Sequence, residues 1–448
     1  MRARATPGCA SLPATDRSQK GLVLVVIDGL TPAMLERAVE SRRAPTLALL
    51  AEHGRYGRAV STFPSLTPVC LSSIVTGAHP NIHHIPHLVW YHRGERRVVE
   101  YGSSFGAIVA AGTRRSILDT ILYMNERHLA ADAITVYEAL EDAGLVAAAV
   151  NITCYRGRTR HRATLPGVTR AAYGPRRFFF YNLFESDATG APLSVRRRSA
   201  GTVDGYAAAV GRWLVTRDGF DCLVFYLSDY DYASHAHGPD AAHEELGRSD
   251  RAVGGLIEAA GGSDAFLERY AVVLCSDHGQ TRVERAVRLQ DSFAGIPGVV
   301  VTASNRAGMV YDLHGGRARE LAERVAGEHL VLFRENGEVV ARQGGDEGIE
   351  LLDEHPQGRE RAAAALANPN AGELIVSAAE GAEFVDLGGR HHLGGGSHGS
   401  LCAGDSEVPV LTVGLEGEPR SIVDLAPLAL AHFGVEPPPY ARPLARAA

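Results

Sequence analysis

The chain has few cysteines and no run of apolar residues long enough to cross a bilayer. Its longest apolar runs, such as LVLVVI and LVAAAV, are far too short for a membrane span. The 6 cysteines are scattered without a CxxC pair, which argues against a disulfide framework and a cysteine-rich zinc site. Residues 1–20 lack the apolar segment of a secretory signal peptide. These absences together predict a cytoplasmic protein.

The chain also lacks an excess of positive charge. Its formal net charge is −7, so no field of the whole protein would attract nucleic acid or an anionic membrane surface. Hydrophobic residues make up 45% and charged residues 22%, which is an ordinary globular composition. A length of 448 residues suits two domains of usual size or one large α/β domain with insertions. The oligomeric state is left open by these numbers.

Four apolar segments have the pattern of parallel strands that are buried on both faces. They are GLVLVVIDGL, GLVAAAVNI, DCLVFYLSDYD and YAVVLCSDHGQ, and helical stretches such as AITVYEALEDAG and YAAAVGRWLVTRDG separate them. Strands that alternate with helices predict an α/β fold with a mostly parallel central sheet and helices on both faces. Ligands of such sheets bind at the carboxyl ends of the strands. The polar residues at those ends are Asp28, Asp229, Asp231, Asp277 and His278.

Two regions fit the strand and helix alternation less well, and we expect them to be insertions into a domain that spans residues 21–440. Residues 1–20 precede it as a flexible arm. Residues 155–200 are rich in arginine and aromatic residues and form a cap beside the site. This cap is either a lid that grips an anionic substrate or, as the composition favours, a solvated flap with its own small core. Residues 285–390 contain further strand-like pieces and a helix near RARELAERVAG.

The stretch STFPSLTPVCLSSIVTGAHP, residues 61–80, predicts a short buried helix. Thr67 is a favoured N-cap residue, Pro68 suits the first helical position, and Gly77 suits the C-terminal end. A helix N-terminus is also an anion site, because free N–H groups and the positive end of the dipole face outward. A hydroxyl there would touch a docked phosphate. On this stretch alone Thr67 is either a cap or a nucleophile.

Carboxylates and imidazoles gather at the ends of the predicted strands. In DYDYASHAHGPD, His235 follows Asp231 by four residues just past a strand end, and CSDHGQT places Asp277 beside His278. The glycine-rich stretch GGGSHGSL presents His398 on a backbone that can approach a ligand closely. Together with Asp28 these residues offer oxygen and nitrogen ligands without a thiolate. This donor set predicts a site for Zn²⁺ or Mn²⁺.

The motifs VVIDG, FPSLT, SSIVTGAHP, SHAHGP, SDHG and SHGS follow one another in an order that resembles the type I phosphodiesterase/nucleotide pyrophosphatase family. That family belongs to the alkaline phosphatase superfamily, and the resemblance spans roughly residues 21–435. It implies an alkaline-phosphatase-like three-layer sandwich with inserted cap regions and two Zn²⁺ per chain, with Mn²⁺ as an alternative. One ion would be bound by Asp231, His235 and His398. The other would be bound by Asp28, Asp277 and His278, with Thr67 as nucleophile and further ligand and also as helix cap.

The resemblance implies hydrolysis of a small-molecule phosphate ester or nucleotide through a phosphothreonine intermediate. The family has a phosphate-binding Asn shortly after the nucleophile, but the stretch HHIPHLVWYH has no Asn in this place. His87, Trp90, Tyr91 or His92 would have to donate instead, or they serve packing only. This departure leaves the preference for diesters over monoesters open. The alternatives are a phosphomonoesterase or phosphonate hydrolase on the same scaffold, and a non-catalytic metal-binding protein.

Overall fold

The computed structural model describes residues 19–164, 169–181, 183–185, 202–217, 219–325 and 327–441. Almost all of the expected N-terminal arm, residues 1–20, lies outside the described residues. The same holds for the arginine run at residues 196–198 of the expected cap.

The central sheet has eight strands in the order β2–β22–β11–β1–β10–β5–β8–β9. Strands β11, β1, β10, β5 and β8 are parallel, whereas β22 runs antiparallel to β2 and β11, and β9 runs antiparallel to β8. All four predicted strands are confirmed, and they are neighbours in the sheet. The strands are β1 Gly21–Ile27, β2 Arg55–Val60, β5 Ala147–Val150, β8 Arg177–Phe180, β9 Phe184–Glu185, β10 Cys222–Leu227, β11 Tyr270–Cys275 and β22 Glu407–Val413.

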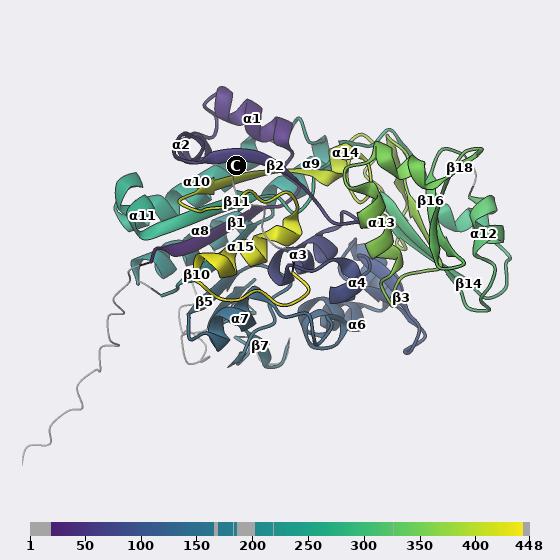
Figure 1. The fold of residues 1–448 in the computed structure, drawn as a ribbon, viewed down its shortest axis with the longest axis horizontal. Coiled ribbons are helices and arrows are strands. Elements are labelled where there is room, and N and C mark those ends of the chain that lie inside the picture. Colours follow the sequence, from purple (N-terminus) through teal and green to yellow (C-terminus); the bar gives the residue numbers. More distant parts are fainter. Residues whose placement is uncertain are drawn as a thin grey trace, which may run out of the picture.

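Helices cover both faces of this sheet, so the predicted three-layer α/β architecture is confirmed (Figure 1). Along β1, Leu22, Leu24 and Val26 join the buried cluster of one face, and Val23, Val25 and Ile27 join the cluster of the other. This alternation explains the unbroken apolar run of the strand. One face is covered by α1 Pro32–Glu40, α2 Pro45–His53, α8 Val203–Thr216, α10 His243–Ala260 and α11 Ser263–Arg269, and the other by α3 Thr67–Thr76, α7 Val136–Asp142 and α15 Leu425–His432.

Helix α3 begins one residue earlier than the cap prediction required. Leu66 is its N-cap, with extended dihedrals of φ −120° and ψ 137°, and no side chain caps the helix. Thr67 is already the first helical residue, so its side chain is not placed to accept from the free N–H groups of the first turn. The prediction that Thr67 caps the helix is therefore wrong. Gly77 ends the helix in the left-handed region with φ 67°, as predicted.

Most of the region 285–390 forms a second, antiparallel sheet in the order β14–β15–β19–β16–β17–β18, at the right of Figure 1. Its two faces bury separate clusters, one of which includes Phe63 and Tyr91 of the main body. The hairpin β16–β17 was not among the predicted strands. The elements are β14 Val299–Ser304, β15 Ala307–Asp312, β16 Leu330–Glu335, β17 Glu338–Gln343, β18 Asp346–Glu347, β19 Leu374–Ser377, α12 Ala318–Arg324 and α13 Gly358–Leu366.

The described part of the region 155–200 does not lie wholly outside the central sheet. Strand β8 pairs in parallel with β5, and Phe178, Phe179 and Phe180 are buried in the clusters of the two sheet faces. Strands β6 Thr159–His161 and β7 Ala172–Gly174 form a separate two-stranded ribbon. Phe178, Phe179 and Phe180 therefore belong to the core at one edge of the sheet, whereas Tyr173 is exposed.

Two further features agree with the composition. Within the part of the chain that the structure describes, no helix combines the length and the apolar character that a bilayer span requires. The five described cysteines form no disulfide, and four of them are buried.

Candidate active site

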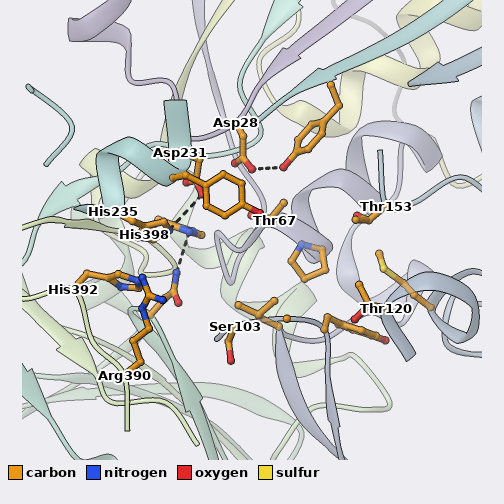
Figure 2. Close-up of a pocket in the computed structure, with 18 of the residues that line it drawn as sticks. Asp28, Thr67, Ser103, Thr120, Thr153, Asp231, His235, Arg390, His392 and His398 are labelled. Carbon is orange, nitrogen blue, oxygen red and sulfur yellow. Dashed lines mark hydrogen bonds and ion pairs between the residues drawn. The ribbon is translucent and has the colours of Figure 1, made fainter. Parts of the chain in front are cut away.

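The predicted site residues meet at the carboxyl ends of three adjacent strands, and Figure 2 shows five of them: Asp28, Thr67, Asp231, His235 and His398. Asp28 follows β1, Asp231 lies just after β10, and Asp277 with His278 follows β11. Since β1 lies between β10 and β11, its neighbours bring their polar ends to the same place. His398 comes from far along the chain, and it follows β21 Gly396–Ser397, which pairs with β12 Thr281–Arg282 just beyond His278.

Asp231, His235 and His398 form a first group of candidate metal ligands, with one ligand atom of each within 4.8 Å of the others. Asp231 and His235 lie one turn apart on α9, Asp229–His237, and Oδ2 of the aspartate is 3.4 Å from Nε2 of the histidine. Gly395 lets the loop of His398 pack on this helix, because a Cβ there would lie 2.0 Å from the carbonyl oxygen of His235. The glycine-rich loop thus approaches the backbone of α9.

A second group of candidate ligands surrounds Nε2 of His278. This nitrogen lies 3.3 Å from Oδ1 of Asp28 and 3.4 Å from Oδ2 of Asp277. Asp231 is also within 4.8 Å of Asp28 and His278, so it lies between the two groups. The hydroxyl of Thr67 is 3.1 Å from the same Nε2 of His278. Thr67 therefore adjoins the second group, which is where the resemblance puts it.

The backbone holds all three histidines in the tautomer that binds metal. Nδ1 of His235 is 2.8 Å from the carbonyl of Gly396, Nδ1 of His398 is 2.7 Å from that of Ser65, and Nδ1 of His278 is 3.1 Å from that of Gly279. A carbonyl only accepts, so each Nδ1 carries a proton, and Nε2 is the nitrogen that each ring directs into the site. Burial also lowers the pKa of His235, and it lowers the pKa of His398 well below its usual value. Neutral imidazoles of this kind are ready metal ligands.

The buried carboxylates of the site concentrate negative charge that a bound cation would stabilise. Among the described residues, neither Oδ1 of Asp28 nor Oδ2 of Asp277 has a hydrogen-bond partner, although both atoms are buried. Burial raises the pKa of Asp28 well above its usual value, and the charges of Asp231 and Asp277 raise it further. Burial likewise raises the pKa of Asp277. Buried carboxylates without partners are costly unless a counter-charge is present. The residues therefore fit divalent cations, and the absence of thiolates suits Zn²⁺ or Mn²⁺.

Two residues that the sequence reasoning missed position the carboxylates. Tyr226 donates a hydrogen bond from its hydroxyl to Oδ2 of Asp28. Gln280 donates from Nε2 to Oδ1 of Asp231, and its Oε1 accepts at 2.6 Å from the hydroxyl of Ser234. Tyr226 lies inside an apolar strand and Gln280 follows the SDHG motif, so neither stood out by residue type. Such outer hydrogen bonds orient metal ligands and tune their basicity.

A cavity of about 240 Å³ opens over the ligand groups. Asn305 lines it, and its Nδ2 lies 3.0 Å from Nε2 of His398. Asn305 has φ 57° in the turn between β14 and β15, where the sequence shows an ordinary hairpin asparagine. The other lining residues are Asp28, Thr67, Pro68, Leu88, Tyr101, Gly102, Ser103, Thr120, Met124, Thr153, Tyr181, Tyr226, Asp231, Tyr232, His235, Arg390, His392 and His398.

The four residues that were considered as substitutes for the family's Asn do not line this cavity. His87 and Trp90 are buried, and Tyr91 packs its ring against Tyr311. His92 stacks on Trp90 with the ring centroids 5.3 Å apart. Packing is therefore the role that the structure supports for these residues.

Two other polar candidates at the strand ends stay outside the ligand groups. His237 is exposed at the end of α9, and Asp229 accepts a hydrogen bond from the backbone N–H of Val203. No described arginine of the region 155–200 lines the cavity. Arg156 and Arg158 instead pair with Glu138. Tyr181 is the contribution of this region to the cavity wall among the described residues.

A three-layer α/β sandwich with this site at the carboxyl ends of its central strands is the architecture of the alkaline phosphatase superfamily. The family model described as type I phosphodiesterase/nucleotide pyrophosphatase matches residues 22–401, and the chain belongs to this family. It is a hydrolase that acts on phosphoric ester or phosphoanhydride bonds. No curated protein matches the chain.

Solved structures agree with this fold. Murine ectonucleotide pyrophosphatase/phosphodiesterase 5 aligns with a TM-score of 0.62 and 14% identity, over 96% of this chain and 98% of that chain. An inactive form of the murine enzyme in complex with AMP aligns with a TM-score of 0.63 and 13% identity, over 96% and 98% of the two chains. Phosphonoacetate hydrolase from Sinorhizobium meliloti 1021 in complex with phosphonoformate gives 0.62 and 20%, over 92% and 96%. At these identities the likeness concerns the fold.

Proposed function

We propose that the protein is a phosphodiesterase or nucleotide pyrophosphatase that acts through a phosphothreonine at Thr67, at a site for two Zn²⁺ or Mn²⁺. The observation that carries this proposal is the position of the Thr67 hydroxyl, 3.1 Å from Nε2 of His278 in the second ligand group. The solved relatives include complexes with AMP and with phosphonoformate, which are small phosphorus anions. A small-molecule substrate suits the cavity of about 240 Å³.

The proposed chemistry has two displacements at phosphorus. Oγ of Thr67 attacks the phosphorus, the bond to the leaving oxygen breaks, and the leaving group departs with the electron pair. Water then attacks the phosphothreonine, which releases phosphate or a phosphomonoester and restores the hydroxyl. A neutral threonine hydroxyl is a poor nucleophile. When bound, two divalent cations lower the pKa of hydroxyl groups and neutralise the charge on the entering and leaving oxygens.

Asn305 provides the amide that the sequence stretch after the nucleophile lacks. It projects from the β14–β15 turn of the second sheet, and its Nδ2 lies at the cavity beside His398. If His398 held a cation, this N–H group would be free to donate to an oxygen of the bound phosphoryl group. Such a donor stabilises the charge that develops on the phosphoryl oxygens in the transition state.

A metal and substrate comparison tests the proposal. Metal-replete protein should bind about two transition-metal ions per chain and hydrolyse bis-p-nitrophenyl phosphate with a higher kcat/KM than p-nitrophenyl phosphate. Chelation should abolish turnover, and Zn²⁺ or Mn²⁺ should restore it. Elemental analysis that finds no metal in an active sample would contradict the metal site. A higher kcat/KM on the monoester would assign the protein to the phosphomonoesterases instead.

Mass spectrometry tests the intermediate. Protein that is quenched with acid during turnover should carry a phosphoryl group on the peptide that contains STFPSLTPVCLSS. The same peptide from Thr67→Ala protein should carry none. A phosphoryl group on another residue of the wild-type peptide would move the nucleophile away from Thr67.

A further inference from the structure

Arg390 is a cation at the catalytic cavity that the hydrolytic chemistry does not use. It is the one arginine or lysine among the described residues that line this cavity. Its side chain is exposed, and its guanidinium has no hydrogen bond or ion pair with any described residue. In Figure 2 the side chain lies beside His392, on the side of the cavity that holds His235 and His398. An arginine at this position is free to pair with an anion of the substrate.

The backbone of Arg390 is held in place by the loop around it. Asp386 accepts hydrogen bonds at 2.8 Å from the backbone N–H groups of Gly388 and Arg390, and its own N–H donates to the carbonyl of Arg390 at 3.0 Å. Gly388 packs directly on the start of α5, Phe105–Ala111, because a Cβ there would lie 2.3 Å from the backbone nitrogen of Ala107. These contacts fix the backbone of the loop at residues 386–390 and thereby the position from which the side chain of Arg390 projects.

The carboxylates nearest to Arg390 along the chain are engaged elsewhere. Asp386 serves the backbone of the loop, as described. Glu383 is 2.6 Å from Nδ1 of His392 and accepts at 2.8 Å from the hydroxyl of Ser397. Neither forms an ion pair with Arg390 within the described structure. The guanidinium thus keeps its hydrogen-bond donors for a ligand.

The position of the loop assigns Arg390 to one end of the substrate. The ring of His392 lies against that of His235 in a tilted arrangement with the centroids 4.2 Å apart, so the loop adjoins the first ligand group. Thr67 contacts His278 of the second group. In an in-line displacement the nucleophile and the leaving group lie on opposite sides of the phosphorus. The first ligand group, and Arg390 with it, therefore lies toward the leaving group.

We infer that Arg390 determines specificity by binding a second anionic group, which the leaving group carries. The substrate class is then a phosphoanhydride whose leaving group is a phosphate, or a phosphorus compound whose leaving group bears a carboxylate. Both share an oxyanion a few bonds beyond the phosphorus that is attacked. This inference rests on the proposed function. It goes beyond that function by naming Arg390 as the residue that recognises a second anionic group of the substrate.

Calorimetric binding to the metal-loaded protein tests the inference with three probes. Methylphosphonate has no second anion, phosphonoacetate carries a carboxylate, and methylenediphosphonate carries a phosphonate. The wild-type protein should bind the two probes with a second anionic group about tenfold to hundredfold more tightly than methylphosphonate, which is the strength of a charge-assisted hydrogen bond. Arg390→Ala should remove this advantage and leave the affinity for methylphosphonate within about twofold. Arg390→Lys should retain part of it, because lysine keeps the charge but not the forked geometry.

Arg43→Ala is the matched control, since Arg43 is exposed and forms no ion pair with a described residue. It should bind all three probes like the wild type. A larger loss for methylenediphosphonate than for phosphonoacetate would assign a phosphate leaving group, and the reverse would assign a carboxylate. Unchanged affinities in Arg390→Ala, or an equal loss for all three probes, would overturn the inference. A wild-type protein that binds methylphosphonate without preferring the probes with a second anionic group would also overturn it. Failure to bind any probe would refute the proposed function itself.

Discussion

Replacing Thr67 with alanine separates the chemistry of its hydroxyl from its structural contribution. The hydroxyl makes one hydrogen bond, at 3.1 Å to Nε2 of His278, and it does not cap α3. Loss of one such bond costs about 1 kcal/mol. Alanine at the first helical position is at least as good a helix former as threonine. The free energy of unfolding of Thr67→Ala should therefore fall by about 1 kcal/mol or less.

The effect on turnover should be much larger. If Thr67 is the nucleophile, its removal deletes the covalent step and leaves only charge stabilisation of a direct attack by water. We expect turnover of bis-p-nitrophenyl phosphate to fall on the order of 10³-fold or more, which corresponds to about 4 kcal/mol in the activation free energy. Thr67→Ser should recover much of the activity, because serine provides the same hydroxyl. The loss of activity and the loss of stability thus differ in a measurable way.

The assay combines initial rates, elemental analysis and thermal unfolding of the metal-replete variants. Thr216→Ala is the control, because Thr216 lies at the far end of α8 and its hydroxyl bonds only to backbone carbonyls of its own helix. It should leave turnover unchanged. Normal turnover by Thr67→Ala would refute the reasoning, since water would then attack phosphorus directly. A fall in metal content that matches the fall in rate would show that Thr67 acts as a metal ligand and not as the nucleophile.

Three further changes test the surroundings of the site. His398→Ala should lower metal content by about one equivalent, because a site that loses a ligand binds its ion poorly. Full metal content and full rate in this variant would show that His398 is not a metal ligand. Tyr226→Phe, which removes the hydrogen bond to Asp28, should weaken metal binding by about tenfold to hundredfold in a competition with a chelator. Asp405→Ala should lower the free energy of unfolding by about 3–5 kcal/mol in denaturant titrations, because it leaves the buried guanidinium of Arg306 without its ion pair at 2.9 Å.

Local patterns were sufficient to predict the strands that carry the site. Strand β1 is apolar at every position because both of its faces are buried, and this leaves an unbroken run that ends at Asp28. The same pattern marks β10 and β11. Since parallel strands place their carboxyl ends at one edge, the polar residues after these runs were expected to meet, and they do. His235 was found by its spacing of four residues from Asp231 just past a strand end, which is also a local property.

Other parts of the site depended on contacts between distant segments. The sequence predicted a cap at Thr67 because residue type and Pro68 suggested one, but the extended dihedrals of Leu66 make it the N-cap, so the helix starts one residue earlier. Asn305 and Arg390 come from the second sheet and its return loop, and each looks like an ordinary turn or surface residue in the sequence. Their position at the cavity is set by how the second sheet packs on the main body.

The sequence by itself determined the residue types, the strand ends and the order of the motifs, because burial on both faces and helical spacing leave periodic signals along the chain. The tertiary structure alone decided that Asp231 lies between both ligand groups, that Tyr226 and Gln280 orient the carboxylates, and that Arg390 lines the cavity with no side-chain partner among the described residues. The physical reason is that hydrogen bonds and ion pairs join side chains across long separations in sequence. The local periodicity of a sequence does not specify which donor will pair with which acceptor far along the chain.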